Sequence, residues 1–252
     1  MSFRSLSVHI THYQSPGRLD FLTRCINSIS DIVIKTDIFV HTNTDLNINL
    51  PNVSVVIHSL KDEHPHFLAW KHRDLMRRQV GMYDAYMYIE DDIQFGQINF
   101  DFWQKHQYRC AEEKCYLGFI RVETDGKKWM CTDVTPVYGN YPLKRIVKID
   151  GVEFIINDCN PYCGFWISSA KEFGWFAEHE HFPPDRCPFY GRHTREKVAC
   201  GPSPLYECVV VLPEEEGSFV HHMPNNYIGH QVLCTISKEE LRTTNKRRQG
   251  ND

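Results

Sequence analysis

The sequence lacks any hydrophobic run long enough to cross a membrane, since no window approaches the ~20 apolar residues that a spanning helix needs. Its first ten residues also lack the apolar core of a secretory signal peptide. Neither sign of charge dominates, because 28 Lys and Arg stand against 32 Asp and Glu, for a formal net charge of −4. These absences predict a cytoplasmic protein with no transmembrane segment and no nucleic-acid partner.

Several short motifs are missing as well. The glycine-rich turns of Rossmann dinucleotide sites and of P-loops do not occur. The 10 cysteines contain no CxxC pair; Cys110 and Cys115 have four residues between them, and Cys159 and Cys163 have three. These spacings do not complete a zinc site. Without a secretion signal, we expect reduced cysteines that are mostly buried, with no pair needed for folding.

What the first 95 residues do contain is an alternation of strand and helix patterns. Apolar and β-branched runs predict strands at Leu6–Ile10, Asp37–His41, Val53–Ile57 and Ala85–Ile89. Helical spacing predicts a helix over Arg18–Ser30 and another from Pro65 to Gly81, with Leu68, Leu75, Met76 and Val80 on its buried side. This alternation predicts an α/β fold with a mostly parallel central sheet flanked by helices.

The second half is less regular and predicts a smaller β region. Asp150-Gly151 between the apolar runs Ile146–Ile149 and Val152–Ile156 indicates a hairpin. The other expected elements are a helix over Phe100–Glu113, strands at Tyr116–Val122 and Cys163–Ser168, a helix over Ala170–Phe176, a short helix over Thr194–Ala199 and an apolar run at Leu205–Leu212. No repeat or linker divides the chain, so we expect one domain over 1–252, with halves at 1–95 and 96–236 and a polar tail at 237–252.

Three consecutive carboxylates, Glu90, Asp91 and Asp92, end the strand at Ala85–Ile89. Adjacent anions at a buried strand end repel each other, so a cation is expected there. Hard oxygen ligands suit Mg²⁺ or Mn²⁺, and open α/β sheets bind ligands at the carboxyl ends of their strands. The alternative is a solvated acidic turn after an edge strand, which the apolar run before it disfavours.

These segments, taken in order, resemble a family-2-like glycosyltransferase of the GT-A fold. Leu6–Tyr13 is similar to the first strand and nucleotide loop of that family, and Tyr86–Asp92 to the strand that carries its DxD motif. Cys163–Phe176 is similar to the acceptor-side segment. Phe219–His222 stands where many such enzymes place a histidine that completes the metal site.

The resemblance implies a GT-A-like (Rossmann-like) fold and a metal-dependent glycosyltransferase. Such an enzyme moves a sugar from a nucleotide-diphosphate sugar to a hydroxyl acceptor, such as a glycan, with Mn²⁺ or Mg²⁺ as its cofactor. The sequence departs from the family at Glu90, which replaces the first aspartate of the motif. It also departs at Val40-His-Thr-Asn-Thr-Asp45, the loop in which the family usually offers an aspartate to the base, so the resemblance leaves the choice of nucleotide open. No QxxRW stretch occurs, which argues against a processive polymer synthase.

The resemblance also implies roles for individual residues. The expected nucleotide-sugar-binding residues are His12, Tyr13, His41, Arg73, Glu90 and Asp91. Asp92 is the expected metal ligand, and His221 or His222 would add a nitrogen ligand, which favours Mn²⁺ over Mg²⁺. Glu196 is the first candidate for the base that deprotonates the acceptor in an inverting reaction, with Asp185 and Glu180 behind it.

Plainer interpretations stay open for several of these residues. Arg73 also fits a solvated basic helix face, Glu196 a helix surface, and His221 and His222 ordinary surface histidines. Two rival functions remain as well. A metal-dependent nucleotidyltransferase uses a similar acidic strand end, and a catalytically silent carbohydrate-binding domain keeps the fold without needing the carboxylates.

Overall fold

The computed structural model describes residues 3–132, 145–157, 160, 162–187, 194–229 and 236–242. The chain forms two compact units, the first from Met1–Ile93 and Gly164–Leu205, the second from Gln94–Cys163 and Tyr206–Asp252. The first unit is therefore discontinuous in sequence, because the segment from Gly164 to Leu205 belongs to it. No helix in the described ranges is both long and apolar enough to cross a membrane.

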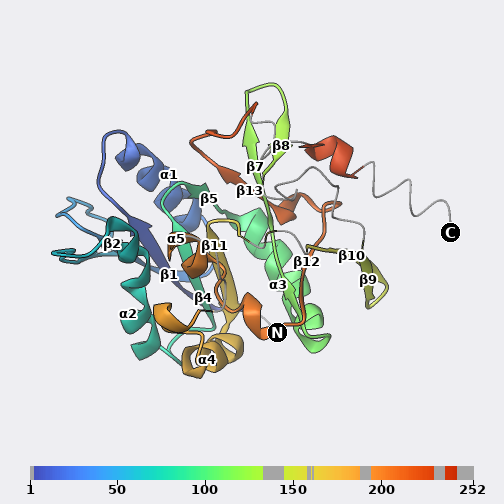
Figure 1. Ribbon diagram of the computed structural model, residues 1–252, viewed down its shortest axis with the longest axis horizontal. Helices are drawn as coiled ribbons and strands as arrows, with labels where there is room; N and C mark the ends of the chain where they lie inside the picture. The colour runs from blue at the N-terminus through green and yellow to red at the C-terminus, as the bar shows by residue number, and fades with distance from the viewer. Residues whose placement is uncertain are drawn as a thin grey trace. The chain divides into compact units, whose positions relative to one another are not determined.

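The first unit is built on a sheet in the order β11-β4-β1-β2-β3 (Figure 1). Its strands are β1 (Ser5–His12), β2 (Lys35–Thr42), β3 (Val53–Ile57), β4 (Ala85–Glu90) and β11 (Phe165–Ser169). β1 runs parallel to both β2 and β4, β2 runs parallel to β3, and β11 pairs antiparallel with β4. The predicted mostly parallel sheet is therefore present, in a mixed α/β architecture. The segment from Gly164 returns to the first unit because β11 completes this sheet.

The helices of the first unit pack on its sheet. α1 (Arg18–Ser30) contacts β2 and has the predicted bounds. The predicted Pro65–Gly81 helix is instead a 3₁₀ turn, η1 (Pro65–Trp70), followed by α2 (His72–Arg78). Because α2 ends before Val80, that side chain is exposed, which corrects the expectation that it is buried. α4 (Ala170–Glu178) contacts β4 and β11, and the short α5 (Thr194–Ala199) contacts η1.

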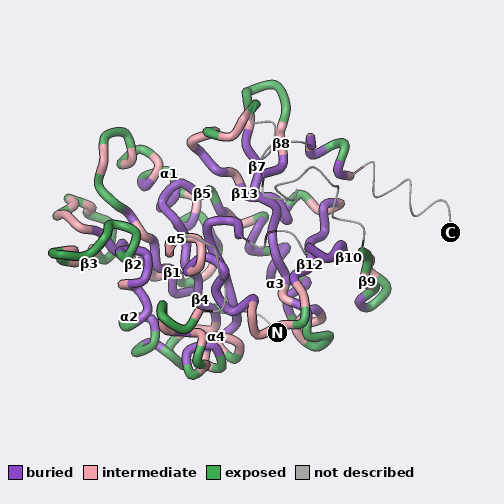
Figure 2. The backbone as a smooth tube through the Cα atoms, in the orientation of Figure 1, coloured by how far each residue is buried: buried purple, intermediate pink, exposed green. Residues whose placement is uncertain are grey.

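β4 is the centre of the first unit, because every one of its residues is buried, as its purple trace in Figure 2 shows. Aromatic rings fill the layer beside it. Tyr86 stacks on Phe173 of α4 with ring centroids 4.3 Å apart, and Tyr88 stacks on His72 of α2 at 4.5 Å. The packing of rings on one face of the sheet holds fixed the strand end from which the carboxylates project.

The second unit contains α3 (Gln97–Glu112) and two further sheets. One has the order β6-β12-β10-β9, from β6 (Cys115–Leu117), β12 (Cys208–Val211), β10 (Val152–Ile156) and β9 (Ile146–Ile149). The other has the order β14-β8-β7-β13-β5. Its strands are β14 (Ile236–Ser237), β8 (Trp129–Cys131), β7 (Ile120–Thr124), β13 (Phe219–His222) and β5 (Ile93–Gln94), where the chain passes from the first unit to the second.

Two sequence expectations have different outcomes in this unit. The β9–β10 hairpin has its predicted bounds, and Asp150 and Gly151 take the positive φ values of 48° and 77° that its turn requires. The single strand expected at Tyr116–Val122 is instead two strands, β6 and β7, which belong to different sheets. The chain changes sheet at Gly118, where an added Cβ would lie 2.6 Å from a Val209 methyl.

The cysteines of the described ranges are free thiols, as predicted. Cys159 lies outside the described residues. Cys115 and Cys208 pair across β6 and β12, with their sulfur atoms 3.3 Å apart. Burial, followed by the hydrogen bond to Cys208, raises the pKa of Cys115 to about 12, which suppresses the reactive thiolate at neutral pH.

Candidate functional site

A pocket of about 330 Å³ lies in the first unit at the carboxyl ends of β1 and β4. This is the edge at which open α/β sheets bind their ligands. The lining residues with charged or hydrogen-bonding groups at this edge include Thr11, Tyr13, Arg18, Glu90, Asp91 and Arg195. β4 therefore ends in a cavity that carries both carboxylates and guanidinium groups.

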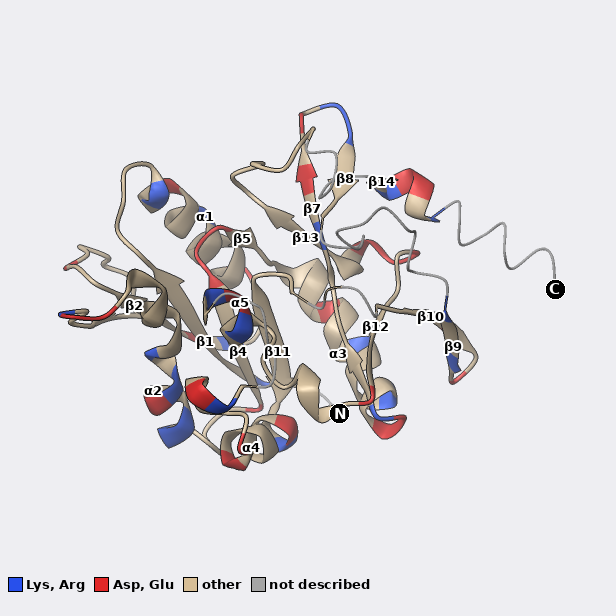
Figure 3. Cartoon of the chain, in the orientation of Figure 1, with Lys and Arg blue, Asp and Glu red and all other residues tan. Residues whose placement is uncertain are grey.

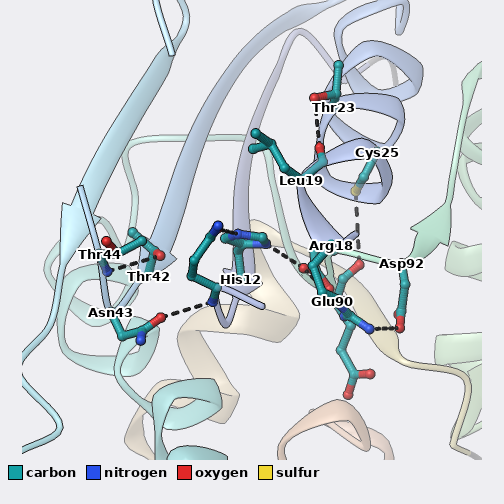
Figure 4. Close-up of polar contacts among 12 residues, drawn as sticks. His12, Arg18, Leu19, Thr23, Cys25, Thr42, Asn43, Thr44, Glu90 and Asp92 are labelled. Carbon is teal, nitrogen blue, oxygen red and sulfur yellow. Dashed lines mark hydrogen bonds and ion pairs between the residues drawn. The ribbon is translucent and has the colours of Figure 1, made fainter. Parts of the chain in front are cut away.

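Arg18 is the cation that neutralises the acidic strand end. It is the first residue of α1, and its side chain reaches Asp92, where Nη1 donates to Oδ2 at 2.8 Å (Figure 4). The same guanidinium donates to both oxygens of Asp91, through Nη2 to Oδ1 and through Nε to Oδ2 at 3.3 Å. Burial alone would lower the pKa of Arg18, but the two carboxylates outweigh it and raise the pKa, so the guanidinium stays charged.

His12 supports Asp91 from the end of β1. Its Nδ1 lies 2.6 Å from Asp91 Oδ2, and its Nε2 lies 2.9 Å from the Gln14 side-chain oxygen. His12 and Asp91 are both buried, at 0% and 1% exposure. The predicted nucleotide-binding residues His12 and Asp91 are thus brought together, with His12 in contact with Asp91 behind the pocket lining.

Glu90 is the carboxylate that borders the pocket alongside Arg195. The Arg195 Nε lies 3.7 Å from Glu90 Oε1, and Tyr88, two residues earlier on β4, also lines the cavity. Burial, followed by the Glu90 charge, raises the pKa of the Tyr88 phenol well above its ordinary value. Gly164 allows the backbone to pass close to Ile93 at this point. Its φ is +81°, and a Cβ at this position would lie 2.8 Å from the Ile93 side chain. Its carbonyl oxygen accepts a hydrogen bond from the Glu90 N–H at 2.9 Å.

The donor atoms have the hard character that Mg²⁺ and Mn²⁺ prefer, but Arg18 already uses several of them. Both oxygens of Asp91 and one oxygen of Asp92 accept hydrogen bonds from its guanidinium. Across the described ranges, no three His, Cys, Asp or Glu side chains converge as a ready metal site. A divalent ion that binds Asp92 through Oδ2 would compete with Arg18 for that oxygen, and the metal stays a prediction.

The other predicted site residues of the first unit fall into separate places. Tyr13 lines the pocket with its side chain 42% exposed. His41 is buried in a row of histidines, with its ring nitrogens 2.8 Å from His9 and 2.8 Å from His58. Arg73 lines a second pocket. The candidate bases lie outside the first pocket's lining: Glu196 is half-buried on α5, and Asp185 and Glu180 are exposed.

His221 and His222 belong to β13 in the second unit, and the structure distinguishes them. His222 is buried, with its Nδ1 2.5 Å from the carboxylate of Glu123, while the other oxygen of Glu123 accepts from the Tyr227 N–H at 2.6 Å. His221 is half-buried, with its Nε2 3.0 Å from the Asn225 side-chain oxygen. A carboxylate that fixes Nδ1–H leaves the lone pair of neutral His222 on Nε2, the arrangement common in metal-binding and catalytic histidines.

Three residues of these clusters were not predicted as site residues: Arg18, Arg195 and Glu123. Arg18 had one available signal, its position immediately after the Pro16-Gly17 turn, where the first helix begins beside the strand ends. Arg195 and Glu123 carried no local signal, because their partners Glu90 and His222 lie about 100 residues away in the chain.

Comparisons with known proteins add little to this geometry. No family model matches the chain, and no curated protein matches it. Among solved structures, it is similar to the crystal structure of S. aureus TarS, with a TM-score of 0.44 and 10% sequence identity over 87% of this chain and 36% of that one. The chain thus spans little more than a third of the TarS chain, and a likeness at this score carries no functional argument.

Proposed function

We propose that this chain is a metal-dependent glycosyltransferase that moves a sugar from a nucleotide-diphosphate sugar to a hydroxyl acceptor such as a glycan. The observation that carries the proposal is the pocket at the carboxyl ends of β1 and β4, where Glu90 and Asp91 meet Arg18 and Arg195. A nucleotide sugar needs both kinds of group, cations for its diphosphate and hydrogen-bond acceptors for its hydroxyls.

The cationic side of the pocket suits the diphosphate. Guanidinium groups bind phosphate oxygens through paired, charge-assisted hydrogen bonds. Arg195 is the better placed of the two for this role, because its side chain is 47% exposed and its Nε lies 3.7 Å from Glu90 Oε1, beyond hydrogen-bonding distance. Arg18 is held by two aspartates and serves to fix the acidic strand end.

The remaining lining groups suit the nucleoside and sugar. Tyr13 offers a partly exposed ring on which a base can stack, and the Glu90 carboxylate can accept hydrogen bonds from ribose or sugar hydroxyls. In the first unit we propose Asp92 as a ligand of Mn²⁺ or Mg²⁺. When bound, the ion supplies Lewis-acid neutralisation of the departing diphosphate.

Glu196 is the base we propose for an inverting reaction. Glu196→Gln keeps the shape of the side chain but replaces the basic carboxylate with a neutral amide, so turnover should fall by about 100- to 10,000-fold while donor binding changes little. Near wild-type turnover in this variant would transfer the role to Asp185 or Glu180. A product that keeps the donor's anomeric configuration would remove the need for such a base.

The test of the function is incubation with a panel of nucleotide sugars and Mn²⁺, followed by assay of the released product. Nucleoside diphosphate supports a glycosyltransferase, pyrophosphate a nucleotidyltransferase, and neither a carbohydrate-binding domain. Arg195→Gln should weaken donor binding about tenfold or more through loss of a charge-assisted contact. Lys197→Gln, on the same helix but outside the pocket lining, is the matched control and should bind the donor normally.

A further inference from the structure

A second pocket of the first unit, about 510 Å³ in volume, has no part in the function proposed above. It uses different residues of the η1 turn: Phe67 and Trp70 line it, whereas Leu68 and Ala69 line the first pocket. Its other walls come from α2 and from the segment Phe182–Pro184. Aromatic and proline side chains therefore surround this cavity, and a cation lies among them.

That cation is Arg73, which is only 5% exposed. Its guanidinium carbon lies 4.8 Å from the ring centre of Trp70, 4.8 Å from that of Phe176 and 4.5 Å from that of Phe182. Its Nη1 donates to the Phe182 carbonyl oxygen at 2.7 Å. Its Nε is buried and has no hydrogen-bond partner within the described parts of the chain.

A buried guanidinium normally pairs with a carboxylate, because removing a charge from water costs several kcal/mol. Arg73 has no such ion pair among the residues that the structure describes, and burial lowers its pKa to about 9. Three aromatic faces offset part of the cost through cation–π attraction. An entering anion would supply the missing countercharge and could accept from the buried N–H.

The lining of this pocket carries charges of both signs around Arg73. Figure 3 shows basic and acidic positions alternating along α2, and the lining holds Lys71 and Arg77 beside Arg73 against Glu63 and Asp74. The Lys71 ammonium is already bound to Glu63 at 2.8 Å.

Phe67 is 39% exposed and, with Pro183 and Pro184, offers flat apolar surface to a ring. Such surfaces stack on the faces of sugar rings.

We propose that this pocket binds an acidic sugar, with the sugar's oxyanion on Arg73 and its ring face against Phe67 and the prolines. The oxyanion can be the carboxylate of a uronic acid or the phosphate of a sugar phosphate, since both offer the same paired oxygens to a guanidinium. The site is separate from the donor pocket and does not depend on glycosyl transfer.

The test is calorimetric titration of the whole chain, without nucleotide or metal, using glucuronate, glucose 6-phosphate and glucose. We expect one or both acidic sugars to bind at least about tenfold more tightly than glucose, and the stronger of the two identifies the preferred oxyanion. Equal affinity for all three sugars, or no binding, would overturn the proposal. Because neither donor nor metal is present, this result is independent of the outcome of the transferase assay.

Variants locate the binding. Arg73→Met should reduce acidic-sugar affinity about tenfold or more, and Phe67→Ala should weaken it for acidic and neutral sugars alike. Arg78→Gln, an exposed arginine of α2 outside the lining, is the control and should change nothing. If Arg73 merely holds the Phe182 segment on α2 and Arg73→Met does not fold, Phe67→Ala still decides, since its side chain is partly exposed. Undiminished binding in a folded variant of either residue would place the sugar elsewhere and refute the assignment.

Discussion

Arg18 Nη1 donates to Asp92 Oδ2 at 2.8 Å, and the same guanidinium binds both oxygens of Asp91. Three successive carboxylates at a buried strand end need a cation, and the chain supplies one from the first residue of α1. Asp91 and Asp92 are 1% and 4% exposed, so water does little to screen their repulsion. The relationship links the fold to the candidate site, because the pairs that hold α1 against the strand end also shape the pocket.

Replacing Arg18 by Met should destabilise the protein by roughly 3 kcal/mol, because two buried carboxylates would lose their partner. The loss should appear as a lower midpoint of chemical unfolding with an unchanged slope. Arg24→Met, an exposed arginine on the same helix, is the matched control and should lie within about 0.5 kcal/mol of wild type. Equal stability of the two variants would show that the ion pairs are not needed to hold the acidic strand end.

The parts of the fold that can be predicted are those determined by interactions between residues close together in the sequence. Arg18–Ser30 carries an apolar stripe at helical spacing, and Asp150-Gly151 demands a turn with positive φ, so α1 and the β9–β10 hairpin have their predicted bounds. The acidic end of β4 and its position at the ligand-binding edge followed from an apolar run that stops at Glu90. In each case the signal lies within a few residues of the feature.

The parts that could not be predicted depend on partners distant in sequence. The family resemblance predicts Arg73 as a nucleotide-sugar-binding residue, but its surroundings come from Phe176 and Phe182, about 100 residues later. The assignment of Gly164–Leu205 to the first unit depends on strand pairing between β4 and β11, which no local pattern specifies. The role of Arg18 could not be predicted because an arginine at the start of a helix can pair with a carboxylate in many parts of the chain, and the sequence does not show which one.

A row of histidines, in which His9 and His41 are buried and His58 is half-buried, should make stability depend on pH. His9, His41 and His58 are joined by ring-nitrogen contacts of 2.8 Å, and burial lowers the pKa of each, that of His9 to about 4. Between the unfolded value of 6.5 and the lower folded values, the unfolded chain binds protons that the folded chain does not. The free energy of unfolding is therefore full above pH 6.5 and falls as the pH drops toward 4.

Each such histidine should contribute up to about 1.4 kcal/mol per pH unit within that window. Urea denaturation at a series of pH values between about 7 and 4 measures the slope. His41→Gln should make the slope shallower, whereas His66→Gln, an exposed histidine, should leave it unchanged. A wild-type slope in His41→Gln would mean that other groups cause the acid sensitivity.

The pair formed by Glu123 and His222 should control the tautomer of the histidine. Glu123 is fully buried and accepts from both His222 Nδ1 and the Tyr227 N–H. Gln at this position keeps the shape but has a single acceptor oxygen, so one of these donors loses its partner unless His222 moves its proton to Nε2.

Nitrogen NMR of the imidazole should show protonation at Nδ1 in the wild type and at Nε2 in Glu123→Gln. The variant should also lose roughly 1 kcal/mol of stability, because hydrogen bonds to a charged carboxylate are replaced by weaker ones to a neutral amide. Glu112→Gln, an exposed residue at the end of α3, provides the control. An unchanged tautomer in Glu123→Gln would show that Glu123 does not set the orientation of His222.

The sharpest prediction concerns the competition between Arg18 and a divalent ion for Asp92. If Mn²⁺ binds Asp92 together with the diphosphate of a nucleotide, Asp92→Asn should lower Mn²⁺-dependent affinity for nucleoside diphosphate by at least about tenfold, since the shape stays and the charge goes. Arg18→Met should have the opposite effect on Mn²⁺ affinity measured without nucleotide. This variant should bind Mn²⁺ more tightly than wild type, because Oδ2 no longer accepts a hydrogen bond from the guanidinium.

Calorimetry with and without nucleotide measures both effects, and Asp20→Asn, an exposed acid in the first turn of α1, is the matched control. Wild-type, Mn²⁺-dependent binding in Asp92→Asn would remove Asp92 as a ligand. No gain in Arg18→Met would show that the guanidinium and the ion do not share an oxygen.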